Sequence, residues 1–77
     1  MADTIEIIKD KIKEVAFKKV GDTDELIKSG ILSSILVVDL ATILEEEFSV
    51  SIPFTEITPE NFSSAELIKK YIETKTN

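Results

Sequence analysis

Apolar residues recur at helical spacing in three segments of the chain. In the first segment, from about Asp3 to Lys19, the residues that form one apolar face are Ile5, Ile8, Ile12, Val15 and Ala16. Asp3 and Glu6 have the spacing of a capping box at the start of this helix. Gly21 is expected to stop it, because glycine commonly follows the last turn of a helix.

The second helix is predicted to begin at Ser33 or Ser34 and to end at Phe48. Its apolar stripe is expected to contain Ile35, Val38, Ala41 or Thr42, and residues 44–48. A longer loop over residues 21–33 precedes it, and Asp22 with Glu25 is expected to cap a single turn there. Four apolar residues of this loop are expected to pack inward: Leu26, Ile27, Ile31 and Leu32.

Residues 49–58 are predicted to form a loop, because the residue before Pro53 avoids the α conformation. Pro59 predicts a short helix over residues 59–62, since proline suits the first helical position. Ser63 and Glu66 have capping-box spacing before a last helix from about Ser64 to Thr74. Its inward-facing residues are expected to be Leu67, Ile68, Tyr71 and Ile72.

This pattern predicts an all-α fold, a small four-helix bundle. It would contain three main amphipathic helices and one short helix, with a long loop between the first and second. The length of 77 residues predicts one domain over residues 1–77.

Composition then excludes several kinds of chemistry. The chain has no Cys and no His, which removes disulfides, thiol nucleophiles, zinc–thiolate sites and an imidazole proton shuttle. A net charge of −6 argues against nucleic acid and anionic membranes as partners. The longest apolar run is Ile35 to Val38, and the charged N-terminus is unlike a signal peptide. We therefore expect a monomer in the cytoplasm, with no membrane insertion.

Catalysis by the chain's own side chains is not expected, so the protein is predicted not to be an enzyme. Adjacent Glu45, Glu46 and Glu47 spread around a helix and do not converge on one point, and no calcium-loop spacing occurs. The remaining route is a group attached to a hydroxyl at the start of a helix, where Ser34 lies. A phosphodiester there would meet unpaired backbone N–H groups. The alternative is that Ser33 or Ser34 serves only as a helix cap.

The run from Leu26 to Ile35, LIKSGILSSI, resembles the modification loop of acyl carrier proteins. Residues 44–48 (LEEEF), Ile52-Pro53 and residues 63–72 also resemble that family, so the similarity covers about residues 3–75. The resemblance implies that a phosphopantetheinyl transferase moves 4′-phosphopantetheine from coenzyme A to Ser34. The thiol of this arm would then hold cargo as a thioester, and no metal would be involved.

The sequence departs from the family at two positions near this serine. Ser33 stands where the family has Asp before the modified residue, and Leu36 stands where an acidic residue is common. The missing Asp puts modification by a generic transferase in question. These departures suggest a specialised member of the family.

The resemblance also implies a recognition face for partner enzymes that carry Lys and Arg patches. On this sequence it corresponds to Ile35, Leu36, Asp39, Thr42, Glu45 and Glu46, with Glu56 and Glu60 as extensions. The alternative is that these charges form only a solvated surface. An acyl pocket, or equally an ordinary core, would contain Val38, Ala41, Ile52, Ile57, Phe62, Ala65 and Leu67.

Three functions remain open at this point. The first is a carrier of acyl intermediates in fatty acid, lipid or specialised-metabolite biosynthesis. The second is a carrier of the aminoacyl or peptidyl type. The third is a helical interaction module that keeps the fold without being modified.

Overall fold

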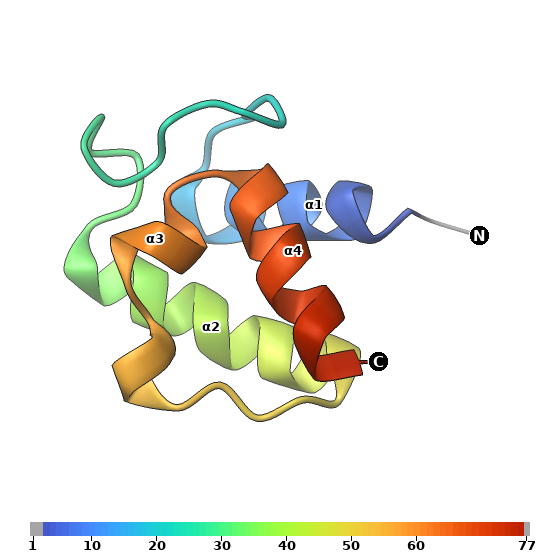
Figure 1. Cartoon of the computed structure of the whole chain (residues 1–77). Coiled ribbons are helices and arrows are strands. Elements are labelled where there is room, and N and C mark those ends of the chain that lie inside the picture. The colour runs from blue at the N-terminus through green and yellow to red at the C-terminus, as the bar shows by residue number, and fades with distance from the viewer. Residues whose placement is uncertain (1–2, 77) are drawn as a thin grey trace.

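The computed structural model describes residues 3–76, and Met1, Ala2 and Asn77 of the predicted domain lie outside the described residues. The elements, in chain order, are α1 (Thr4–Ala16), α2 (Ser34–Phe48), the short 3₁₀ helix η1 (Phe54–Glu56), α3 (Pro59–Phe62) and α4 (Ala65–Thr76) (Figure 1). Residues 3–76 contain no strand, so the predicted all-α fold is confirmed. None of their helices is long and apolar enough to cross a membrane.

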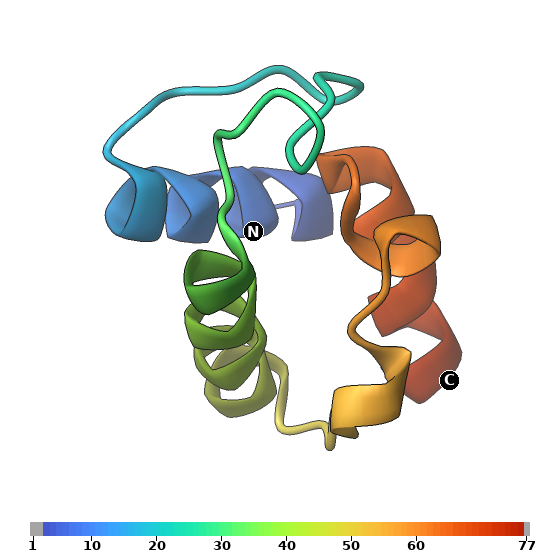
Figure 2. The ribbon, with the colours of Figure 1, turned by 90° about the vertical axis from the view of Figure 1, so that its left-hand side faces the viewer.

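Helix α1 lies across the ends of α2 and α4, which descend from it on opposite sides (Figure 2). It packs against both, and α3 packs against α4. The core between them is aliphatic apart from Phe62 and Tyr71, and its largest fully buried side chains are Phe62, Ile8, Ile12, Leu26, Leu32, Leu40, Leu44, Ile68 and Ile72. Burial of this apolar surface is the main force that holds the helices together.

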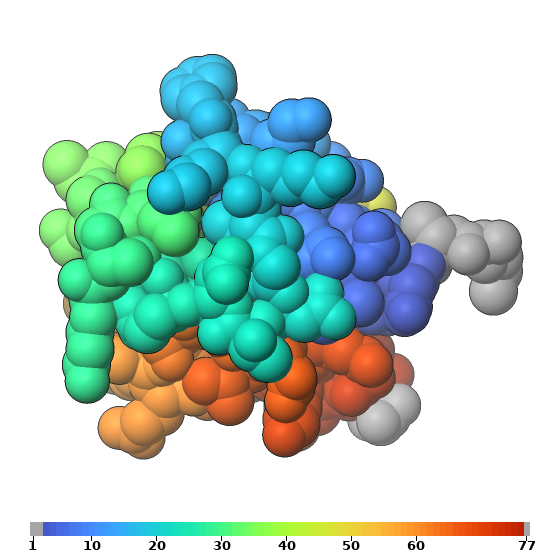
Figure 3. All heavy atoms as spheres, turned by 90° about the horizontal axis from the view of Figure 1, so that it is seen from above, coloured from blue at the N-terminus to red at the C-terminus, as the bar shows by residue number. Residues whose placement is uncertain are grey.

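The loop between α1 and α2 covers one face of the molecule (Figure 3). Leu26 and Leu32 are buried, while Ile27 and Ile31 are half-buried against the core. The Leu26 N–H donates to the Ser63 carbonyl at 2.8 Å, and the Leu32 N–H donates to the Leu26 carbonyl at 2.8 Å. The loop is thus anchored by backbone hydrogen bonds and by the apolar side chains that the sequence predicted.

Helix α1 ends three residues earlier than predicted. Phe17 adopts the left-handed conformation with φ 56°, and its N–H donates to the Lys13 carbonyl at 2.9 Å. Gly21 therefore does not stop the helix; its N–H donates to the Asp24 carboxylate at 2.8 Å. The Asp3 side chain makes no capping hydrogen bond, so the predicted capping box is also wrong.

The turn predicted around Leu26 is not a capped helical turn. The Glu25 carboxylate accepts from the Ser29 N–H at 3.0 Å, four residues later, and so closes the loop from inside. The Asp22 carbonyl accepts from the Glu66 N–H at 2.9 Å, which ties the loop to α4. The Glu25 carboxylate and the Asp22 carbonyl thus make contacts within the loop and with α4, and they do not cap a helical turn.

The predicted apolar stripe of α2 is partly wrong. Ile35 is 72% exposed and Val38 is 36% exposed, whereas Leu40, Ala41 and Leu44 are buried. The helix is apolar on most of its circumference near its start, so spacing alone does not identify the inward face. Packing against α1 and the loop selects that face.

The last two helices follow the prediction closely. Helix α3 has the expected bounds, and α4 extends to Thr76. Ser64 caps α4, because its Oγ accepts from the Leu67 N–H at 3.1 Å, so the predicted capping box at Ser63 is wrong. Ile68, Tyr71 and Ile72 are buried as expected, and Leu67 is half-buried.

Candidate functional site at the start of helix α2

Ser33 and Ser34 are neighbours with different structural roles. Ser33 is the N-cap of α2, with extended backbone angles, and its Oγ accepts from the Leu36 N–H at 3.2 Å. Ser34 is the first residue of the helix, and it is exposed. Its hydroxyl makes no hydrogen bond to any of residues 3–76. The structure therefore leaves the Ser34 hydroxyl available and commits the Ser33 hydroxyl to the backbone.

The chain reaches Ser34 through a turn that requires glycine. Gly30 has φ +84°, a conformation that other residues rarely adopt, and its N–H donates to the Ile27 carbonyl at 3.1 Å. Leu32 follows with a side chain that is 2% exposed. This buried leucine fixes the chain two residues before Ser34, so the serine is presented from an anchored backbone.

The start of α2 favours a negative charge. The N–H groups of Leu36 and Val37 are paired with the side chain and the carbonyl of Ser33, respectively. The backbone N–H groups of Ser34 and Ile35 have no such partner among the described residues. The first turn contains no acidic side chain that would neutralise the helix dipole. An anion on the Ser34 hydroxyl would therefore lie in a favourable field.

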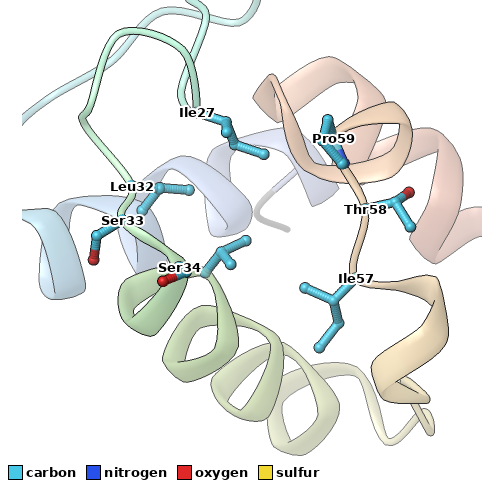
Figure 4. A pocket seen from close by; sticks show the side chains of 8 residues that line it. Ile27, Leu32, Ser33, Ser34, Ile57, Thr58 and Pro59 are labelled. Carbon is cyan, nitrogen blue, oxygen red and sulfur yellow. The ribbon is translucent and has the colours of Figure 1, made fainter.

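An apolar hollow of about 180 Å³ opens beside this serine, between the start of α2 and the segment that leads into α3. Figure 4 shows Ile27 and Ile57 directed towards it, while the hydroxyls of Ser33 and Ser34 point away from its centre. Its lining residues are Ile27, Leu32, Ser33, Ser34, Val37, Ile57, Thr58 and Pro59. Of the residues predicted for an acyl pocket, Ile57 lines this hollow, whereas the buried members of that set belong to the core: Ala41, Ile52, Phe62 and Ala65.

Two carboxylates hold the segment that forms the far wall of the hollow. The Glu45 Oε2 accepts from the Ile52 N–H at 2.7 Å. The Glu56 carboxylate accepts from the Tyr71 hydroxyl and forms an ion pair with Lys75 Nζ at 2.8 Å. Lys75, and then the Tyr71 hydroxyl, hold the pKa of Glu56 below its usual range. Burial, and then Glu56, raise the pKa of Tyr71.

The residues predicted for partner recognition divide into three groups. Ile35, Asp39, Thr42 and Glu46 are exposed and share the outward face of α2, and Glu60 is exposed on α3. Leu36 is half-buried against the core. Glu45 and Glu56 are the carboxylates described above, so their charges are engaged within the protein.

Sequence reasoning missed two exposed aromatic side chains. Phe17 is 91% exposed after α1, and Phe54 is 77% exposed in η1. Both lie in segments where the apolar spacing of a helix has ended. A large apolar residue outside the periodic pattern is the signal that could have identified them.

No protein-family model matches the chain. A comparison with curated proteins finds similarity to aminoacyl carrier protein 1 of Bradyrhizobium diazoefficiens, with 43% identity over 44 residues. This match confirms the predicted resemblance to carrier proteins. The matched region is 57% of this chain and 49% of the relative, so it spans about half of that protein's length.

Proposed function

We propose that this chain is a carrier protein that bears 4′-phosphopantetheine on Ser34. The observation that carries this proposal is the different hydrogen bonding of two adjacent serines. Ser33 satisfies the backbone of α2, and the exposed Ser34 hydroxyl remains unused at the helix start. The similarity to a protein named as a carrier gives independent support.

The chemistry of attachment requires little from the chain itself. The Ser34 oxygen bonds to the phosphorus that carries pantetheine, and the phosphoanhydride bond of coenzyme A breaks. Adenosine 3′,5′-bisphosphate leaves, and the serine proton passes to a base on the transferase. Ser34 then bears a phosphodiester anion, which the free N–H groups and the dipole of α2 stabilise by about 0.3–1 kcal/mol at an exposed position.

The attached arm supplies the thiol that the chain lacks, since the sequence contains no Cys. Partner enzymes would act on the thioester while the protein supplies position. The exposed carboxylates of Asp39, Glu46 and Glu60 suit partners with basic patches, and long-range attraction between opposite charges speeds docking.

Two classes of cargo are proposed for the arm. The name of the relative supports an amino acid, whereas the resemblance in the sequence placed acyl chains first. Mass spectrometry distinguishes them after incubation of the modified protein with ATP and a mixture of amino acids or fatty acids in an extract of the source organism. The adduct on the arm identifies the cargo, and its loss with hydroxylamine identifies a thioester.

Intact-mass measurement tests the attachment itself. Incubation with coenzyme A and a transferase of the source organism should add the mass of one phosphopantetheine to the protein. Ser34→Ala should abolish the gain, and Ser33→Ala should retain it. A wild-type protein that gains no mass with any tested transferase would support the unmodified interaction module. A gain that persists in Ser34→Ala would place the attachment elsewhere.

A further inference from the structure

A strained and exposed aromatic residue follows α1. Phe17 has φ 56° and its ring is 91% exposed. The left-handed region is disfavoured for bulky L-residues, and glycine is the usual residue at such a position. Phe17, Lys18 and Lys19, which we call the Phe17 corner, are all exposed. An apolar ring in this place contributes little to folding.

Lysines without ion-pair partners lie close to Phe17 in the chain. Lys13, Lys18 and Lys19 are exposed and form no ion pair with any of residues 3–76. In contrast, Lys9 pairs with Glu6 at 3.1 Å and with Asp22 at 2.8 Å. The chain as a whole has a net charge of −6. Residues 17–19 therefore carry positive charge only, although Glu6 and Asp10 line the same hollow as Lys13 and Lys19.

The Phe17 corner follows directly on the C-terminal end of α1. Figures 1 and 2 both place the C-terminal end of α1 on the side of the molecule where α2 begins, and the two helices are in contact. The first turn of α2 contains no acidic residue, and Ile35 there is 72% exposed. The first carboxylate of the helix is that of Asp39. The residues beside Ser34 are therefore mostly apolar, the lysines of the corner lie at the end of α1 on the same side of the molecule, and the acidic face begins more than one turn further along α2.

We propose that the Phe17 corner is a docking contact for the enzyme that transfers phosphopantetheine to Ser34. The surface of that enzyme which meets the corner would present carboxylates around an apolar recess that accepts the phenyl ring. This inference rests on the proposed function. The transferase is the partner that must bring its reacting atoms to the Ser34 oxygen itself, so its surface covers the surroundings of Ser34. Enzymes that act later reach only the far end of the arm.

Two contacts of opposite sign would fix the orientation of the docked enzyme. A basic patch would meet Asp39 and Glu46 on α2, and an acidic rim would meet Lys18 and Lys19 on the corner. A partner rotated about α2 would bring like charges together, which is unfavourable. A buried aromatic ring is a common anchor of a binding hot spot.

Initial rates of mass gain at limiting protein concentration test the contact. Phe17→Gly removes the ring at a backbone conformation that glycine adopts freely, so folding should not suffer. Lys18→Glu with Lys19→Glu reverses the charge of the corner. Lys69→Glu with Lys70→Glu makes the same change of net charge on α4, although it also removes the Lys70–Glu66 ion pair, and it serves as the control for net charge. The melting temperature of each variant checks that it is folded.

The proposal expects kcat/KM for modification to fall about tenfold in the Lys18, Lys19 variant and about fivefold or more in Phe17→Gly. The Lys69, Lys70 control should stay within about twofold of wild type. Added salt should reduce the difference between wild type and the Lys18, Lys19 variant, because it screens the attraction.

Corner variants that are modified as fast as wild type, at Ser34, would overturn the docking contact and leave the proposed function intact. An equal loss of rate in the control would also overturn it, because the effect would then reflect net charge alone. A wild-type protein that is not modified at Ser34 would overturn both proposals.

Discussion

Two adjacent serines at the start of α2 differ in their hydrogen bonding. The Ser33 hydroxyl accepts a hydrogen bond from the Leu36 N–H, whereas Ser34 is the first residue of the helix and is exposed. From sequence alone, either serine could be the N-cap of the helix, because serine is a good cap at both positions. The capping geometry leaves free the hydroxyl of Ser34, the residue to which the resemblance to the carrier family points.

This difference predicts different costs for two matched substitutions. Ser33→Ala removes the cap of α2 and should lower the free energy of unfolding by about 0.5–2 kcal/mol. Ser34→Ala removes a hydroxyl that bonds to nothing among the described residues, so it should change stability by less than about 0.5 kcal/mol. Urea unfolding of both variants measures the difference. Equal losses would mean that Ser33 does not act as the cap.

At the scale of elements, local patterns predicted the helices better than their faces. Pro59 marked the start of α3, and the spacing of Ile8 and Ile12 identified the inward side of α1. The inward side of α2 was not predicted, because residues 35–38 are all apolar and any rotation of the helix buries some of them. Only the neighbouring elements decide which rotation gives the best packing.

The site itself was predictable only where local chemistry defined it. The helix start at Ser34 could be read from caps and spacing, but the roles of Glu45 and Glu56 depend on distant partners. Glu45 reaches the Ile52 N–H, and Glu56 reaches a tyrosine and a lysine on α4. No local pattern encodes such contacts, so from sequence alone both residues are assigned to the recognition face for partners.

The contact between η1 and α4 should respond to acid. Lys75 and Tyr71 lower the folded-state pKa of Glu56 below the ordinary value of 4.5, so the unfolded chain takes up this proton first. The stabilisation from Glu56 is therefore present above pH 4.5 and is lost as the pH falls through the lower, folded value. Glu56→Gln should unfold more easily than wild type near pH 7 and should lose less of its stability between pH 5 and pH 3.

Chemical unfolding across this pH range measures the effect. Glu73→Gln, on an exposed residue of α4 that forms no ion pair within residues 3–76, is the control and should follow the wild-type profile. A Glu56→Gln profile parallel to that of wild type would show that the ion pair with Lys75 does not hold η1 against α4.

At the scale of the whole molecule, charges of the two signs are unevenly distributed. Exposed carboxylates follow the outward face of α2 and continue on α3, whereas Lys13, Lys18 and Lys19 lie at and beyond the end of α1; Asp10 on α1 and Glu73 on α4 are exposed carboxylates outside this pattern. This distribution gives the molecule an electric dipole moment as well as a net charge. A partner can therefore be oriented by the field before contact is made.

Two adjacent glutamates of α2 should separate docking from folding. Glu46→Lys changes an exposed charge and should lower kcat/KM for modification without loss of stability. Glu45→Lys also removes the acceptor of the Ile52 N–H and should cost about 1–3 kcal/mol in the free energy of unfolding. Thermal unfolding and modification rates at low salt provide both readouts. A destabilised Glu46→Lys, or an unchanged Glu45→Lys, would contradict this division.

Helix α2 carries its charges in the order opposite to the one its dipole favours. Its first turn has no acidic residue, its last turn has no basic residue, and Glu45, Glu46 and Glu47 lie near its negative end. Under the proposed function, the phosphodiester on Ser34 supplies the missing anion. Folding and modification form a thermodynamic cycle, in which the free energies sum to zero. If the arm stabilises the folded state by a given amount, removal of the arm is less favourable from the folded chain than from the unfolded chain by the same amount. Folding would thus make loss of the phosphopantetheine arm less favourable.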